Sequence, residues 1–334
     1  MKKFINDVDN ILTESLLGFA SAHSDLVSLH LNPNFLTRTK KTNGKAQNKV
    51  AIISGGGSGH EPLHTGYIGY GMLDAACPGY VFTSPSPDQM LAAADAVHAG
   101  KGILFIVKNY AGDVMNFEMA AEMLPYESAT VLTSDDCAVI NSTYTTGRRG
   151  VAGTIIVEKC VGSLAETGAS LQACKALGDK VNSRTSSIGV ALTSCTVPAA
   201  GRPTFELAEN EIEMGVGIHG EPGRKRMPMA KADVIVKNCI DAIVADFSAK
   251  SISMMSDGLL LINGFGATPL MELYLIYNSA AKLLTAHGVT ITQSLVGNYT
   301  TALDMAGASI SLCLLDDEIK QHWCSKVQTV ALSW

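Results

Sequence analysis

Apolar residues occur along this chain in short runs that alternate with longer segments of mixed character. A short apolar run bounded by glycine or polar residues is typical of a buried strand. Longer segments with apolar residues three and four positions apart are typical of helices that pack on a sheet. The alternation of the two patterns therefore predicts an α/β fold.

The predicted strands are residues 50–53, 103–107, 130–133, 188–192, 259–262 and 310–315. The predicted helices are residues 5–19, 87–99, 116–124, 153–166, 171–181, 230–245 and 269–287. Ser86 and Thr268 are predicted to cap helices that begin at a proline, and Gly288 to end the last helix. Residues 32–48 are predicted to be irregular and residues 66–79 to be mostly loop.

The chain has 334 residues, which exceeds one average core and predicts two domains. A polar run at residues 182–187 marks the boundary, so we predict an N-terminal α/β domain at 1–185 and a C-terminal one at 186–334. The composition agrees, because 47% hydrophobic and 17% charged residues are typical of a well-buried α/β protein and exclude disorder.

Charge and hydropathy exclude several classes of function. The net charge is −6 and no basic block occurs, so direct nucleic-acid binding is not expected. No apolar run reaches the length of a membrane span, and polar residues interrupt the start, so no signal peptide is expected. We expect a soluble cytoplasmic protein. The eight cysteines are scattered without zinc-ligand spacing and are predicted to be buried free thiols.

The stretch at residues 50–62 reads VAIISGGGSGHEP, an apolar run that ends in glycines. This pattern predicts a strand running into a tight loop whose bare backbone could touch a small polar ligand. It is neither a P-loop, which needs Lys after its last glycine, nor a dinucleotide fingerprint, whose third glycine position is His60 here. His60 is then a side chain that can move a proton near neutral pH. The alternative is a purely structural turn.

Two loops repeat one theme, a histidine on glycine-relieved backbone beside a Glu-Pro pair. They are residues 59–62, with His60, and residues 219–222, with His219. A single such histidine is more often structural, but one in each half indicates a shared cleft between the domains.

Asp113 follows the predicted strand 103–107 in a loop, with Lys108 five residues earlier. A carboxylate there could accept a proton from a substrate hydroxyl, and Lys108 could bind an oxygen or balance the charge. A surface ion pair is the alternative. His64, His98, His287 and His322 are predicted to be ordinary side chains on loop rims or helix faces. We expect no metal site, because Pro62 breaks the helix that a His60–His64 pair would need.

Six segments make the sequence recognisable. They are residues 54–62 (SGGGSGHEP), 82–88 (FTSPSPD), 108–113 (KNYAGD), 144–150 (YTTGRRG), 195–201 (CTVPAAG) and 217–223 (GIHGEPG). In order and along essentially the whole chain, they resemble the dihydroxyacetone-binding subunits of dihydroxyacetone kinases. The resemblance implies two α/β domains with the ligand in the cleft between them.

The resemblance also implies roles for individual residues. His219 adds to the ketone of dihydroxyacetone as a covalent hemiaminal, His60 is its acid/base partner, and Asp113 helps to deprotonate the accepting hydroxyl. The residues that hold the adduct are Lys108, Gly57, Ser58 and Gly59. A covalent bond suits a small, flexible ligand that buries too little surface to bind tightly otherwise.

No ATP-binding module follows within the 334 residues, so the resemblance is to the phosphotransferase-system type. That type implies a separate partner subunit that carries ADP and Mg²⁺, no cofactor in this chain, and a homodimer. A second reading is a coactivator paralogue, which binds dihydroxyacetone but partners a transcription regulator. The features that favour it are Tyr80, Asn141 and the short segment 124–136, which depart from the kinase subunits mostly outside the ligand loops.

Overall fold

The computed structural model describes the chain except residues 1, 40–47, 140–144 and 222. The sequence observations on Asn141, Tyr144 and Pro222 therefore lie outside the described residues. The chain forms two compact units, and each is described by itself. The first contains Met1–Thr133, Ile155–Lys180 and Gln321–Trp334, and the second contains Ser134–Thr154 and Val181–Lys320.

The chain passes between the units more than once, whereas the sequence indicated one boundary near residue 185. Residues 134–154 belong to the second unit although they precede that boundary, and the C-terminal residues 321–334 return to the first. A polar run marks only a place where the chain leaves one unit, and it does not show where a later segment packs.

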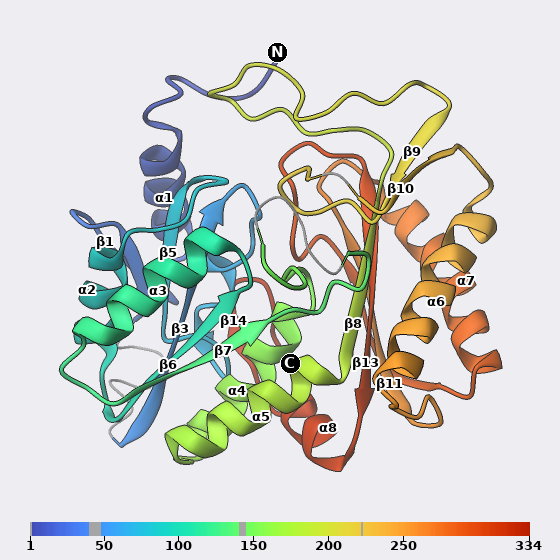
Figure 1. Cartoon of the computed structure of the whole chain (residues 1–334). Coiled ribbons are helices and arrows are strands. Elements are labelled where there is room, and N and C mark those ends of the chain that lie inside the picture. The colour runs from blue at the N-terminus through green and yellow to red at the C-terminus, as the bar shows by residue number, and fades with distance from the viewer. Residues whose placement is uncertain (1, 40–47, 140–144, 222) are drawn as a thin grey trace. The chain divides into compact units, whose positions relative to one another are not determined.

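The first unit is built on a six-stranded sheet with the order β1-β2-β5-β3-β6-β7 (Figure 1). The strands are β1 (Val27–His30), β2 (Phe35–Arg38), β3 (Lys49–Ser58), β5 (Ala75–Val81), β6 (Gly100–Lys108) and β7 (Ser128–Thr133). β5, β3, β6 and β7 run parallel, and β2 and β1 continue the sheet in antiparallel pairs. β3 is buried along its whole length, as a central strand covered on both faces should be.

The helices that belong wholly or mainly to this unit are α1 (Ile11–Ala22), α2 (Pro87–Val97), α3 (Ala111–Met123), α4 (Thr154–Glu166) and α5 (Leu171–Ser183). α2 and α3 cover one face of the sheet (Figure 1), where Met90 and Phe117 pack with Ile53 and Phe105. Three short elements complete the unit: the 3-10 helix Thr65–Tyr67, and β4 (Gly69–Tyr70) paired with β14 (Gln328–Thr329). α8 (Asp317–Cys324) joins the two units in sequence.

Several local predictions for this unit were wrong. The stretch predicted to be mostly loop contains β5, and the irregular stretch contains β2. α3 begins at Ala111, earlier than predicted, so Asp113 lies in a helix and not in a loop. The strand predicted at 130–133 is confirmed as part of β7, which lies within the segment 124–136 that had looked unusual. The predicted cap at Ser86 is confirmed, because Ser86 and Gln89 form a capping box at the start of α2.

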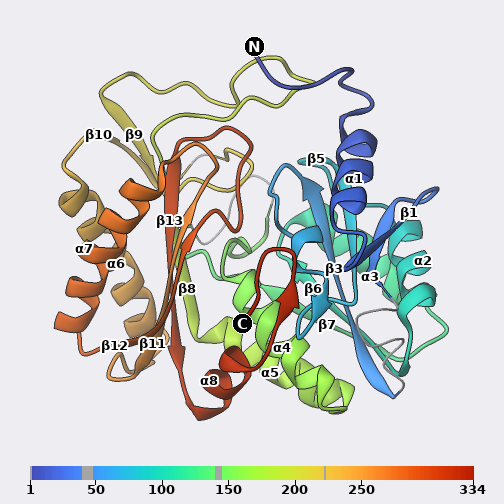
Figure 2. The same ribbon diagram turned by 180° about the vertical axis from the view of Figure 1, so that it is seen from behind.

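The second unit has a six-stranded sheet with the order β10-β9-β8-β13-β11-β12. Its strands are β8 (Thr185–Ala191), β9 (Glu211–Met214), β10 (Lys225–Pro228), β11 (Asp257–Gly264), β12 (Thr290–Gly297) and β13 (Gly307–Leu315). Only β11 and β12 pair in parallel among these described strands. α6 (Ala232–Ala249) and α7 (Leu270–Ala286) cover one face of this sheet in both views (Figures 1 and 2).

The strands predicted at 188–192, 259–262 and 310–315 correspond to β8, β11 and β13. The apolar cluster between this sheet and its helices includes Ile240, Ile262 and Leu312. The predicted cap at Thr268 was wrong. Pro269 is the N-cap of α7, and the Thr268 hydroxyl donates to the Gly307 carbonyl at 2.6 Å. α7 ends just before Gly288, whose φ of +89° closes it as predicted.

All eight cysteines are free thiols, and six of them are buried, close to the prediction. Cys324 is exposed and Cys137 half-buried. Among the described helices, none combines the length and apolar character needed to cross a membrane.

Candidate functional site

In the first sheet, the order in which successive strands are added changes side at β3. The chain passes from β3 to β5 on one side, and then to β6 on the other side of β3. Ligands of open α/β sheets bind beside the carboxyl ends of the strands at such a switch point. Here those ends are Ser58 on β3 and Lys108 on β6, both of which the sequence predicted to bind substrate.

Gly55, Gly56 and Gly57 form part of β3 itself, which corrects the prediction of a tight loop beginning at Gly55. A methyl group on Gly56 would overlap the Lys108 ammonium nitrogen, and one on Gly57 would lie 2.6 Å from the Thr83 backbone nitrogen. These glycines therefore allow close approach of neighbours within the sheet. Only Gly59, with φ +100°, uses the conformational freedom of glycine to leave the strand.

The groups after β3 are held by contacts within the protein. The Ser58 hydroxyl donates to the Gly79 carbonyl at 2.7 Å. The Gly59 backbone N–H donates to the two Glu61 carboxylate oxygens at 3.0 and 3.1 Å. Glu61 therefore fixes the turn that presents His60.

His60 is fully buried, and its ring stacks on Phe82 with 4.9 Å between ring centroids and an angle of 16°. Phe82 has φ +56°, a strained conformation for a bulky residue, and its backbone N–H donates to the Ser58 carbonyl at 2.9 Å. Strain of this kind is common beside functional groups. Phe82 thus fixes the plane of the His60 ring.

Lys108 and Asp113 form a buried pair. The Lys108 Nζ lies 3.8 Å from Asp113 Oδ2, and the two side chains are 0% and 4% exposed, which excludes the surface ion pair. Asp113 lies in the first turn of α3, where the helix dipole favours a carboxylate. Its Oδ1 is buried and makes no hydrogen bond within the described part of the chain. Burial lowers the pKa of Lys108, although Asp113 and Glu158 oppose the shift.

His64, which the sequence had placed among the ordinary histidines, is the centre of a buried network. Its Nε2 lies 2.8 Å from the Lys108 Nζ, and its Nδ1 lies 2.6 Å from Glu158 Oε1 and 3.0 Å from the Ser54 hydroxyl. Burial, together with the charge of Lys108, holds the pKa of His64 well below its usual value. His64 is therefore a neutral imidazole between an amine and a carboxyl group.

Glu158 is the residue of this network that the sequence prediction missed. It lies on α4 and is fully buried, and burial raises the pKa of its carboxyl group to about 8, with Lys108 and Ser54 opposing. The available signal was an acidic side chain in the apolar run TIIVEKCV of a predicted helix. Such a group in a core requires a partner.

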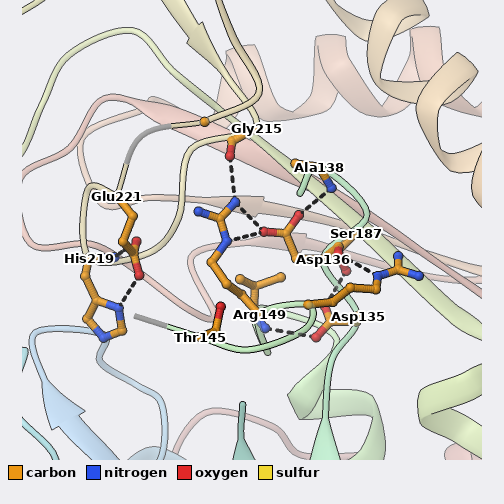
Figure 3. Close-up of polar contacts among 12 residues, drawn as sticks. Asp135, Asp136, Ala138, Thr145, Arg149, Ser187, Gly215, His219 and Glu221 are labelled. Atoms are coloured by element: carbon orange, nitrogen blue, oxygen red, sulfur yellow. Dashed lines mark hydrogen bonds and ion pairs between the residues drawn. The ribbon is translucent and has the colours of Figure 1, made fainter. Parts of the chain in front are cut away.

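In the second unit, His219 is oriented by Glu221 (Figure 3). Its Nδ1 lies 2.9 Å from Glu221 Oε1, and its backbone N–H donates to Oε2 at 3.0 Å. Burial alone would raise the pKa of Glu221, but His219 and Arg149 lower it to about 2. A carboxylate that accepts the Nδ1 proton makes Nε2 the basic and nucleophilic nitrogen of the neutral ring.

Arg149 adds a positive charge that acts on Glu221, and Figure 3 shows its contacts with Asp136 and Gly215. It is fully buried, its Nε donates to Asp136 Oδ2 at 2.7 Å, and its guanidinium also donates to the Gly215 carbonyl at 2.7 Å. A methyl group on Gly217 would overlap Glu221 Oε2 and approach the Arg149 guanidinium to 2.8 Å. The glycine therefore lets the guanidinium stand close to the carboxylate. The sequence showed Arg149 only as part of a recognisable segment.

The structure brings together, within the first unit, the predicted residues Ser58, His60, Lys108 and Asp113, and places His219 in the second. That both groups face one cleft stays a prediction, as do the roles of the individual residues. Within the described ranges, no group of three or more His, Cys, Asp and Glu side chains could hold a metal ion.

The chain belongs to the Dak1 domain family, whose model matches residues 17–331. It is 47% identical, over its whole length and 99% of the relative, to the "PEP-dependent dihydroxyacetone kinase, dihydroxyacetone-binding subunit DhaK" of Escherichia coli strain K12. It is also 47% identical, over 95% of each chain, to the corresponding subunit of a "PTS-dependent dihydroxyacetone kinase 1" of Listeria innocua.

Solved structures of related proteins superpose on this chain over nearly its whole length. The "Dihydroxyacetone kinase operon co-activator Dha-DhaQ" superposes with a TM-score of 0.87 at 33% identity, covering 95% of this chain and 97% of that one. The dihydroxyacetone kinase of C. freundii gives a TM-score of 0.84 at 33% identity, covering 98% of this chain and 60% of that one. These similarities confirm the α/β fold and the family that the six segments indicated.

Proposed function

We propose that this chain is the dihydroxyacetone-binding subunit of a phosphotransferase-dependent dihydroxyacetone kinase. The observation that carries the proposal is the 47% identity, over essentially full length, to relatives named as that subunit. The chain also contains a histidine prepared as a nucleophile, His219, and a buried carboxylate with an open acceptor atom, Asp113.

In the proposed first step, His219 Nε2 attacks the carbonyl carbon of dihydroxyacetone. The new N–C bond forms as the C–O π bond opens, and the oxygen takes a proton from His60. The positive charge left on the imidazole ring is balanced by the Glu221 carboxylate, which is held ionised beside it. A covalent adduct orients a three-carbon substrate and rejects glycerol, which has no carbonyl group.

In the proposed second step, Asp113 Oδ1 accepts the proton of the hydroxyl group that receives the phosphoryl group. Lys108 lies against the other oxygen, Oδ2, and keeps the carboxylate in place. The backbone of Gly57, Ser58 and Gly59 is proposed to contact the adduct. We propose that ADP and Mg²⁺ belong to the partner subunit, that the chain acts as a homodimer, and that it works in the cytoplasm.

The coactivator is the second candidate, because the structure titled as an operon co-activator superposes with a TM-score of 0.87. Tyr80, one of the departures from the kinase subunits, is 70% exposed and could contribute to a different partner surface. The identity to that co-activator is 33%, lower than the 47% to the kinase subunits, which favours the kinase.

The test combines the purified chain with an ADP-bearing subunit and a phosphoryl donor from the same organism. We expect consumption of dihydroxyacetone, and a crystal soaked in dihydroxyacetone should show continuous density from His219 Nε2 to the ligand. A chain that gives no turnover, but retains a transcription regulator only when dihydroxyacetone is present, would overturn the kinase in favour of the coactivator.

His219→Ala is expected to abolish the adduct and lower turnover by at least about a thousandfold, because the nucleophile is removed. Calorimetric binding of dihydroxyacetone should be lost while the circular dichroism spectrum is unchanged. His287→Ala, at an exposed residue that ends α7, is the matched control and should bind normally. Equal affinity in both variants would contradict the covalent mechanism.

A further inference from the structure

Four buried ionisable side chains of the first unit form one continuous line of contacts. Asp113 Oδ2 lies 3.8 Å from the Lys108 Nζ, which lies 2.8 Å from His64 Nε2, and His64 Nδ1 lies 2.6 Å from Glu158 Oε1. No side chain of the four is more than 4% exposed. The proposed function uses only Lys108 and Asp113, so it does not account for His64 and Glu158.

A purely structural role explains this line poorly. Buried ion pairs are often no more stable than apolar side chains of similar volume, because removing charges from water costs several kcal/mol each. The line also includes a carboxyl oxygen, Glu158 Oε2, that is buried and makes no hydrogen bond within the described residues. Strongly perturbed ionisable groups in contact with one another are more typical of a functional site.

The directions of the hydrogen bonds follow from the contacts. The Ser54 hydroxyl donates to the Ile106 carbonyl at 2.6 Å, so it faces His64 Nδ1 as an acceptor. The Lys108 ammonium can only donate, so it donates to His64 Nε2. His64 therefore carries its proton on Nδ1 and donates it towards Glu158. A neutral imidazole in this position can take a proton at one nitrogen while it releases the other.

The charge states support such a transfer. Burial lowers the pKa of Lys108 and raises that of Glu158 to about 8, so both shifts favour transfer of a proton from Lys108 to Glu158. Burial and the charge of Lys108 keep the pKa of His64 low, so a long-lived imidazolium is disfavoured. The charged or polar side chains outside the four that act on this line are Ser54 on β3 and His60 in the following loop.

Building on the proposed function, we propose that His64 and Glu158 form a proton relay that discharges Lys108 when Asp113 takes the proton of the substrate hydroxyl. The Lys108 Nζ gives a proton to His64 Nε2, and the Nδ1 proton of His64 passes to Glu158 Oε1. Lys108 and Glu158 end neutral, His64 ends protonated on Nε2, and no proton is gained or lost. Without the relay, the protonated Asp113 would leave a buried ammonium group opposite a neutral partner.

The first experiment needs no turnover. It records the imidazole ¹⁵N chemical shifts of His64 in the histidine-labelled full chain and in Asp113→Asn, whose neutral amide stands in for protonated Asp113. The relay predicts the Nδ1–H tautomer in the unaltered chain and a shift towards the Nε2–H tautomer in Asp113→Asn. With Glu158→Gln added, the proton has no acceptor, so the spectrum should keep the Nδ1–H tautomer. An unchanged Nδ1–H tautomer in Asp113→Asn would overturn the relay, whether or not the kinase assay succeeds.

The second experiment measures turnover in His64→Gln, Glu158→Gln and the double variant. Glutamine at 64 can still accept from Lys108 and donate to Glu158, but it cannot pass a proton through. Each single variant should lower kcat roughly tenfold or more with KM for dihydroxyacetone changed less than about twofold, since neither side chain touches substrate. The double variant should lose no more than either single one, because both act in one path.

The solvent isotope effect separates a relay from a structural role. In the unaltered chain, a plot of kcat against the D₂O fraction should be curved, because several protons move in the same step. In the variants the plot should be linear. Ser163→Ala, also on α4 and in contact with His322, is the control and should keep the curve. Additive losses with an unchanged isotope effect would overturn the relay. A shift to the Nε2–H tautomer in Asp113→Asn, with no turnover in the unaltered chain, would retain the relay and refute the kinase instead.

Discussion

The nucleophilic role proposed for His219 depends on the charge of Glu221. This carboxylate is almost completely buried, yet its pKa is lowered to about 2, because the gain from His219 and Arg149 exceeds the cost of burial. Only an ionised Glu221 holds the Nδ1 proton and makes Nε2 the attacking atom. The sequence placed His219 beside a Glu-Pro pair, but it showed neither the contact with Glu221 nor the fully buried Arg149.

Glu221→Gln tests this dependence through pH. Because the folded pKa of Glu221 lies below the ordinary 4.5, its contribution to the free energy of unfolding is present above pH 4.5 and disappears as the pH falls towards 2. The shift corresponds to roughly 3 kcal/mol at neutral pH. Calorimetric melting should show a large difference between the variant and the unaltered chain at pH 7 and almost none near pH 2.

Glu209→Gln, at an exposed position of the same unit, should show no such pH dependence. A Glu221→Gln difference that stays constant between pH 7 and pH 2.5 would contradict the assignment of a lowered pKa. Dihydroxyacetone binding should also weaken at least about tenfold in Glu221→Gln, because the amide cannot hold the ring nitrogens in one tautomer as firmly.

At the scale of elements, β3 positions the site because its glycines have no side chains. Its glycines leave room for neighbours on both sides, with Lys108 against Gly56 and the backbone at Thr83 against Gly57. The sequence located this stretch correctly but assigned the glycines to a loop, because glycine is unfavourable in strands unless something packs against the bare backbone. What packs there, Lys108, comes from a strand that follows more than forty residues later.

Gly56→Ala should therefore displace the Lys108 ammonium, because its new methyl group would overlap that nitrogen. We expect turnover to fall about tenfold or more and the ¹⁵N shift of His64 Nε2 to change, because the displaced ammonium group no longer donates to that nitrogen. Gly18→Ala is the matched control, since Gly18 is an exposed residue of α1 with open space around it. That variant should gain roughly 1 kcal/mol in stability without losing turnover. Normal turnover in Gly56→Ala would show that the position of Lys108 does not matter.

At the scale of the whole molecule, two six-stranded sheets carry different side chains of the proposed site. The first unit contains buried ionisable groups at the carboxyl ends of parallel strands, and the second contains His219, which the proposed function makes the nucleophile. The proposed function requires one ligand to use both. A ligand that binds only the folded chain stabilises it by an amount that depends on its concentration relative to Kd.

Dihydroxyacetone at about one hundred times its Kd should stabilise the chain by about 2.7 kcal/mol, and so raise the melting temperature by a few degrees. Glycerol at the same concentration should give no shift, and neither should dihydroxyacetone with His219→Ala. Differential scanning calorimetry measures all three. An equal shift with glycerol would show that binding does not depend on the carbonyl group.

The sequence by itself determined the α/β class, because helical and strand periodicities are local properties of the chain. It also indicated His60, Lys108, Asp113 and His219, because each lies beside glycine-rich or polar residues that interrupt an apolar run. Only the tertiary structure decided that Glu158 meets His64, 94 residues earlier, in a fully buried contact. No local sequence pattern predicts this contact, because it depends on how α4 packs on the sheet and not on the residues next to Glu158 or His64.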